Sequence, residues 1–193
     1  DRGFERINPD ISGRPQLIRG TKQILFPHMR VSEACVLTLK NKSHSVTAAV
    51  NIANGPAEGV IVTQGGEAGG WTLYVKGGKH KYCYNFFGIE HYFAEAENII
   101  PTGKHQVRME FKYDGGGLAK GGDVTLYYDG KSVGKGRGEK TQAMGYSADG
   151  AAPAPRLRPL QEHGAHRVRG RRPAEGQREG VHRLAVRQLL TGP

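Results

Sequence analysis

The sequence predicts an all-β fold over residues 43–140, an antiparallel sandwich or barrel. Short runs rich in β-branched and aromatic residues follow one another at regular spacing, and Gly-, Asn- and Asp-containing turn signals separate them. Apolar and polar residues alternate within the runs, most clearly where Val107, Met109 and Phe111 interleave with charged residues. We find no helical period of useful length in this part of the sequence.

The expected strands can be placed one by one between the turn signals. The strand-like runs span residues 43–52, 58–65, 70–76, 80–88, 90–96, 105–114, 124–130 and 131–137. The turn signals between them are Asn54-Gly55-Pro56, Gly65-Gly66, Gly77-Gly78, Pro101-Thr102-Gly103, Asp114-Gly115-Gly116-Gly117 and Asp129-Gly130. Short strands at this spacing are typical of an antiparallel sandwich or barrel.

The segment GGWTLYVKGGKHKYCYNFFG, residues 69–88, is predicted to form a hairpin. Gly77-Gly78 is a strong two-residue turn signal because both positions can adopt positive φ. This turn places Trp71 opposite Tyr84 and Leu73 opposite Tyr82. The resulting core face is predicted to carry Trp71, Leu73, Val75, His80, Tyr82, Tyr84 and Phe86. We therefore interpret Trp71 as a core residue rather than a ligand platform.

The opposite face of this hairpin is polar and is a candidate contact surface. It is predicted to carry Thr72, Tyr74, Lys76, Lys79, Lys81, Cys83 and Asn85. We take Tyr74, Lys76, Lys79, Lys81 and Asn85 as candidate contact residues, together with Asp114 and Asp123 from a later loop. Lysines interleaved with aromatics are a weak indication of nucleic-acid binding. The hairpin register weakens this indication, because the register puts Tyr82 and Tyr84 on the other face.

Residues 1–42 are predicted to form an irregular lead-in, because Pro9, Pro15 and Pro27 interrupt them. One or two short strands are expected there. The first residues are charged and show no signal peptide, and the chain opens without Met, so we expect a fragment. Nowhere does an apolar run approach the length of a membrane span.

Residues 149–193 differ in composition from the rest of the chain. They contain Arg but no Lys and no aromatic residue, and they carry half of the formal net charge of +10. Such a segment can build little core, so we expect disorder over most of it. The exception is EGVHRLAVRQLL, in which Val181, Leu184 and Leu189 could line one side of a short helix. A basic tail that binds nucleic acid or an acidic surface is one explanation of this composition.

Motifs for catalysis or metal binding are weak. Cys83 falls on the hairpin face opposite His80, which argues against a metal pair. Residues 114–123 could clasp an ion, but a long mobile loop explains them better. Residues 130–136 are one residue short of a phosphate-binding loop and fit a strand better. Asn41-Lys42-Ser43 matches a glycosylation sequon. Cys35 and Cys83 could pair, although two reduced thiols are the simpler reading.

The sequence resembles a known family over residues 4–148. The runs that carry the resemblance include ERINPDISGRPQLIRGTKQILFPHM, EGVIVTQGGEAGGWTLYVKGGKHKYCYNFFGIEHY and YDGGGLAKGGDVTLYYDGKSVGKGR. They are similar to the C-terminal region of large bacterial arylsulfatases. The resemblance implies a concanavalin- or laminin-G-like jelly-roll sandwich at 43–148, after a lead-in from a missing catalytic domain at 1–42.

The catalytic motif of that family does not carry over. Sulfatases use a C/S-x-P-x-R motif beside a divalent cation such as calcium, and neither Cys35 nor Cys83 starts that motif. We therefore expect a non-catalytic accessory domain without a cofactor of its own, whose partner is the catalytic domain. Without a signal peptide, the bacterial cytoplasm is favoured over the periplasm. The alternative is a stand-alone carbohydrate-binding module, with a carbohydrate or sulfated ligand and without nucleic acid or membrane as partner.

The resemblance and the composition both break near Ser147-Ala148-Asp149. Out-of-frame translation of GC-rich DNA yields Arg, Ala, Pro and Gly, so we predict a reading-frame shift at this point. In the resembling family a final strand closes the sandwich beyond it. We expect that strand to be missing here, which would leave an exposed sheet edge prone to self-association.

Overall fold

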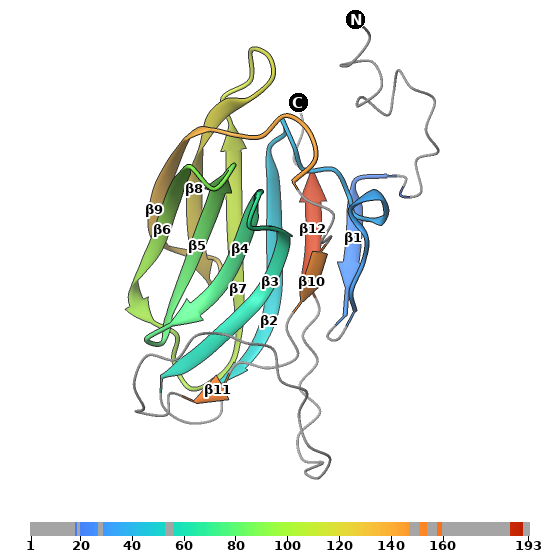
Figure 1. Cartoon of the computed structure of the whole chain (residues 1–193). Helices are drawn as coiled ribbons and strands as arrows, with labels where there is room; N and C mark the ends of the chain where they lie inside the picture. The colour runs from blue at the N-terminus through green and yellow to red at the C-terminus, as the bar shows by residue number, and fades with distance from the viewer. Residues whose placement is uncertain are drawn as a thin grey trace, which may run out of the picture.

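The computed structural model describes residue 18, residues 20–26, 29–52 and 56–146, and the backbone of strands at 151–153, 158–159 and 186–190. These residues form an antiparallel β-sandwich, as predicted (Figure 1). The strands are β1 (Lys22–Leu25), β2 (His44–Ile52), β3 (Ala57–Gly66), β4 (Gly69–Lys76), β5 (Lys79–Phe86), β6 (Glu90–Ile99), β7 (Gly103–Tyr113), β8 (Lys120–Tyr128), β9 (Lys131–Lys140), β10 (Ala151–Pro153), β11 (Arg158–Pro159) and β12 (Val186–Leu190), with one short 3₁₀ turn at Glu33–Cys35.

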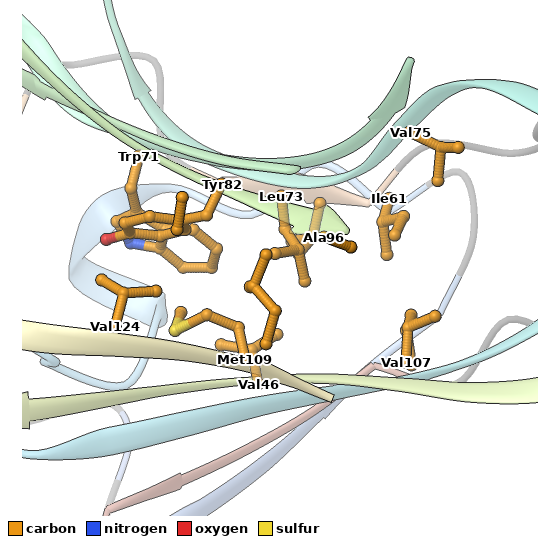
Figure 2. Packing of buried hydrophobic residues seen from close by; sticks show 14 of the residues in the cluster. Val46, Ile61, Trp71, Leu73, Val75, Tyr82, Ala96, Val107, Met109 and Val124 are labelled. Carbon is orange, nitrogen blue, oxygen red and sulfur yellow. The ribbon is translucent and has the colours of Figure 1, made fainter. Parts of the chain in front are cut away.

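The strands form one continuous sheet that folds back on itself into two facing layers. Their order is β1-β12-β2-β7-β8-β9-β6-β5-β4-β3-β10, and β11 pairs with β3. The lower layer in Figure 2 includes β2, β7 and β8, and the upper layer includes β3 to β6. The layers join where β9 meets β6, through the pair Ala94 and Gly136. We call this junction the seam.

The β4–β5 hairpin has the register that the sequence predicts. Trp71 pairs with Tyr84, Leu73 with Tyr82, and Lys76 with Lys79, around the turn at Gly77-Gly78. Gly77 and Gly78 both have positive φ, of 60° and 75°. The turn therefore uses the conformational freedom of the two glycines, and it fixes which side chains face the core.

The core lies between the two layers and is apolar. Trp71 is 2% exposed, and Leu73, Met109 and Leu126 have no exposed surface. Figure 2 shows Trp71, Tyr82 and Leu73 from the upper layer above Val46, Met109 and Val124 from the lower one. The prediction that Trp71 belongs to the core is thus confirmed. Phe86, the last residue of the predicted core face, is partly buried against the cluster.

Two expectations for the loop and tail segments are wrong. β8 begins at Lys120, so the loop after Asp114 is shorter than expected and Asp123 lies within a strand. Residues 186–190 form a strand, not a helix, because they pair with backbone on both sides: Val186 with Leu25 of β1 and with Ala48 of β2. The predicted absence of a further strand beyond residue 149 is therefore also wrong.

Most of the tail lies outside the described residues, and so does most of the lead-in at 1–42. The lead-in contributes β1, in agreement with the one or two short strands expected there. The reading-frame shift stays a prediction. In the part of the chain that the structure describes, no helix is long and apolar enough to cross a membrane. Cys35 and Cys83 are not joined by a disulfide.

Candidate ligand-binding face

The outer surface of β4, β5 and β6 gathers most of the contact residues that the sequence predicts. Strand pairing arranges it in three rows across the strands. The rows are Asn85 and His91; Thr72, Cys83 and Phe93; and Tyr74, Lys81 and Glu95. We call these eight residues the platform. Their inward neighbours, including Leu73, Tyr82 and Ala94, are buried, so the platform side chains point away from the core.

Phe93 is a strongly exposed aromatic side chain of the platform. It is 60% exposed in the middle of a strand, where an apolar ring gains nothing from the core. The ring of His91 lies 6.4 Å from it, with 21° between the two planes. Sequence reasoning missed both residues as site candidates. Their alternation with the buried Tyr92 and Ala94 could have indicated an outward aromatic.

A charged group lies beside Phe93 on the platform. Lys81 Nζ is 2.6 Å from one carboxylate oxygen of Glu95, and Lys79 Nζ is 3.5 Å from the other. The hydrogen bond from Lys81 lowers the pKa of Glu95. Partial burial raises the pKa of the neighbouring Tyr74, so its hydroxyl stays protonated at neutral pH. The group thus offers both acceptors and donors to a polar ligand.

Asn85 has a structural role that limits it as a contact residue. Its Nδ2 donates to the carbonyl oxygens of Gly66 and Glu67, at 3.1 and 3.0 Å. Its Oδ1 accepts from Gly88 N at 2.7 Å. Asn85 therefore ties the β3–β4 turn to the β5–β6 turn at one end of the platform. Lys76, at the opposite end beside the Gly77-Gly78 turn, is exposed.

Asp114 and Asp123 do not join the platform, although the sequence grouped them with it. They lie at the end of β7 and in β8, where Arg137 of β9 binds both of them. Arg137 Nη2 is 2.9 Å from Asp114, and Nη1 is 3.1 Å from Asp123. The bonds from Arg137 lower the pKa of Asp114. Both carboxylates are thus paired with Arg137 and are not free to bind a cation. Among the described residues, no group of three side chains could hold a metal ion.

Two further sequence motifs have structural explanations. The run that resembles a phosphate loop is β9, an extended strand paired with β8. Asn41 of the sequon has φ of 56°, and its amide is used within the fold. Its Nδ2 donates to Ala143 O at 3.1 Å, and its Oδ1 accepts from Ala119 N at 2.9 Å. An amide held in this way is not free to carry a glycan.

No family model and no curated protein match the chain. Solved structures that it resembles include the CBM40 of the Ruminococcus gnavus IT-sialidase, bound to α2,3-sialyllactose, with TM-score 0.48 and 8% identity over 89% of this chain and 92% of that one. Another is the receptor-binding domain of botulinum neurotoxin type G, with TM-score 0.42 and 9% identity over 78% of this chain. The chain spans about a third of the length of that neurotoxin domain, covering 33% of it.

Proposed function

We propose that this chain is a non-catalytic carbohydrate-binding module whose ligand lies across the platform. The observation that carries the proposal is Phe93, an aromatic ring 60% exposed on an otherwise polar sheet face. A sugar ring has an apolar face of C–H groups and an edge of hydroxyls. An exposed aromatic ring packs against the apolar face of the sugar, and the surrounding polar side chains form hydrogen bonds with its hydroxyls.

The neighbours of Phe93 fit this chemistry. Glu95 and Lys81 hold each other in place at 2.6 Å, so neither side chain must be ordered when a ligand arrives. The Glu95 carboxylate can accept from sugar hydroxyls, and Lys81 and the protonated Tyr74 can donate to them. His91, stacked beside Phe93, extends the aromatic surface along β6.

The test is glycan binding by the purified chain, first on an array of oligosaccharides and then by calorimetry with the best ligand. We expect Phe93→Ala to lower the affinity about fivefold, because one aromatic contact contributes on the order of 1 kcal/mol. Ile89→Ala is the matched control, since Ile89 is an exposed apolar residue of the adjacent turn, outside the platform. Equal losses in both variants, or glycan binding by neither variant nor wild type, would contradict the proposal.

The accessory role in a sulfatase-like hydrolase is a second proposal, supported by the resemblance of residues 4–148. In this role the sandwich covers the catalytic domain and borders its substrate entrance. It predicts that the isolated chain does not hydrolyse aryl sulfate esters, even with added calcium. It also predicts that the coding DNA upstream of Asp1 encodes a C/S-x-P-x-R motif. Turnover by the purified chain, or an upstream region without that motif, would count against it.

A further inference from the structure

The middle row of the platform continues onto β3, so that one outward residue from each of four strands lies in line across the sheet. Thr63 of β3 pairs with Thr72 of β4, which pairs with Cys83 of β5. Cys83 in turn pairs with Phe93 of β6. We call these four residues the cross-strand row. Because neighbouring strands lie about 4.8 Å apart, the row extends roughly 14 Å from Phe93 to Thr63.

The end of the row away from Phe93 offers hydrogen-bond acceptors. The Oγ1 atoms of Thr63 and Thr72 lie 2.9 Å apart, and Thr63 Oγ1 also donates to Trp71 O at 3.3 Å. Since the hydroxyl proton of Thr63 goes to that carbonyl, Thr72 must donate to Thr63. The remaining lone pair of Thr72 Oγ1 can therefore accept a hydrogen bond from a sugar hydroxyl.

Cys83 separates the aromatic end of the row from the hydroxyl end. Its side chain is small and half-buried, and burial raises the pKa of its thiol. The thiol is therefore uncharged at neutral pH. A ligand that crosses from Phe93 to Thr72 passes over this neutral side chain and does not have to break an ion pair.

A second row of polar side chains runs beside the cross-strand row on the same strands. It contains Tyr74 on β4, Lys81 on β5 and Glu95 on β6. Each of them lies two residues along its strand from the cross-strand row, a distance of about 6.7 Å. A chain of sugar rings laid over β6, β5 and β4 would thus have a hydrogen-bonding side chain beside every ring.

In the other direction from Phe93 the sheet offers no such path. The next strand is β9, and the sheet folds from one layer to the other where Ala94 meets Gly136. Arg137, which follows Gly136, is paired with three carboxylates, including Glu139 at 3.2 Å. A straight ligand that starts on Phe93 can therefore continue toward β4 but not toward β9.

We propose that the platform binds a linear oligosaccharide of at least three rings, laid across the strands from Phe93 to Thr72. This inference rests on the proposed function and narrows its ligand class. One pyranose ring of an extended chain advances by nearly the spacing of neighbouring strands, so successive rings lie over β6, β5 and β4. The first ring rests on Phe93, the second passes over Cys83, and a hydroxyl of the third donates to Thr72 Oγ1.

The test is a chain-length series measured by calorimetry with the purified chain. The probes are linear β-1,4-linked cello-, manno- and chito-oligosaccharides of two to five rings. In the series that binds best, we expect the trisaccharide to bind about fivefold more tightly than the disaccharide, because it gains the hydrogen bond to Thr72. The pentasaccharide should bind no more tightly than the tetrasaccharide, since the row ends at β3.

Thr72→Val removes the accepting oxygen and keeps a β-branched side chain suited to a strand. We expect it to lower the affinity for the trisaccharide about fivefold and to leave the affinity for the disaccharide unchanged. Thr125→Val is the matched control, because Thr125 also points outward, between the buried Val124 and Leu126 of β8 in the other layer. It should change neither affinity. Thermal unfolding of both variants verifies that they are folded.

The outcomes separate this inference from the proposed function. A wild type that binds disaccharides as tightly as longer chains, or that binds glycans on the array but none of the linear probes, overturns the inference and leaves the carbohydrate-binding module standing. A gain from disaccharide to trisaccharide that persists undiminished in Thr72→Val also overturns it. If the wild type binds no glycan at all, the inference and the proposed function both fall.

Discussion

Trp71 Nε1 donates a hydrogen bond of 3.2 Å to Gln64 Oε1 inside the core. The two residues face each other across β3 and β4, and Gln64 is 1% exposed. The indole thus fills the space between the layers and also satisfies a buried amide. A buried polar atom that loses its partner costs about 1–3 kcal/mol, so this pair helps to fix the register of β3 against β4.

Trp71→Ala should therefore destabilise the chain far more than Tyr74→Ala. We expect a loss of about 3–5 kcal/mol for Trp71→Ala, from the cavity and the unpaired Gln64. Tyr74→Ala should lower the free energy of unfolding much less, because Tyr74 is half-buried on the platform side of the same strand. Urea unfolding measures both losses of stability. It is followed by far-ultraviolet circular dichroism, because Trp71→Ala removes the only tryptophan as a fluorescence probe. A larger loss in Tyr74→Ala would contradict the orientation of the hairpin.

Asn41→Ala is expected to destabilise the fold by about 2–3 kcal/mol. The substitution removes two hydrogen bonds that hold Ala119 and Ala143, and it places Ala in the left-handed region. Asn41→Gly is the control, because it loses the same hydrogen bonds without the backbone strain, and it should lose less. The difference between the two variants in urea unfolding measures the strain. Equal losses would mean that the backbone conformation costs nothing.

Stability should fall as the pH drops below about 6.5, because His80 is buried without charge. Burial lowers its pKa to about 3, and neither ring nitrogen has a hydrogen-bond partner among the described residues. The unfolded chain takes up a proton near pH 6.5, so it binds more protons than the folded chain between pH 6.5 and about 3. His44, whose pKa burial lowers to about 4, acts with the same sign. Each should remove up to about 1.4 kcal/mol per pH unit, His80 between pH 6.5 and about 3 and His44 between pH 6.5 and about 4.

The measurement is urea unfolding between pH 6.5 and 5, above the range in which the surface carboxylates titrate. In His80→Phe the free energy of unfolding should change less steeply with pH, by the contribution of one proton, which is about 1.4 kcal/mol per pH unit. The aromatic contact with Tyr128 should remain in this variant. Asp129 raises the pKa of His105, which contributes with the opposite sign above pH 6.5. A slope that His80→Phe does not alter would contradict the burial of a neutral imidazole.

Gly136→Ala and Gly138→Ala form a matched pair that tests the seam. At Gly136 the added methyl would lie 2.5 Å from Phe93 O and 2.7 Å from Ala94 Cβ, so we expect a loss of about 1–3 kcal/mol from overpacking. Gly138→Ala should leave stability within about 0.5 kcal/mol of the wild type, because its methyl would make ordinary contacts with the Tyr92 ring at 3.6 to 3.9 Å. Thermal unfolding of the two variants side by side is sufficient. A larger loss at Gly138 would show that β6 covers both positions.

The sequence by itself determined the β-sandwich class, the succession of strands from residue 43 to 140 apart from the early start of β8 at Lys120, and the register of the β4–β5 hairpin. These are local properties: Gly77-Gly78 fixes the turn, and alternation with a period of two then decides which side chains face the core. For the same reason the amino-acid pattern was sufficient to assign Trp71 to the core, and Tyr74 and Lys81 to one outer face.

The tertiary structure alone decided which distant segments meet. The exposure of Phe93 depends on what covers β6, and the room for a side chain at Gly136 and Gly138 depends on how closely β6 passes over β9. The role of Asn41 depends on Ala119 and Ala143, more than seventy residues away in the chain. The position of β12 between β1 and β2 joins the two ends of the sequence. Local patterns carry no information on such contacts, because they are set by how two layers close around a shared core.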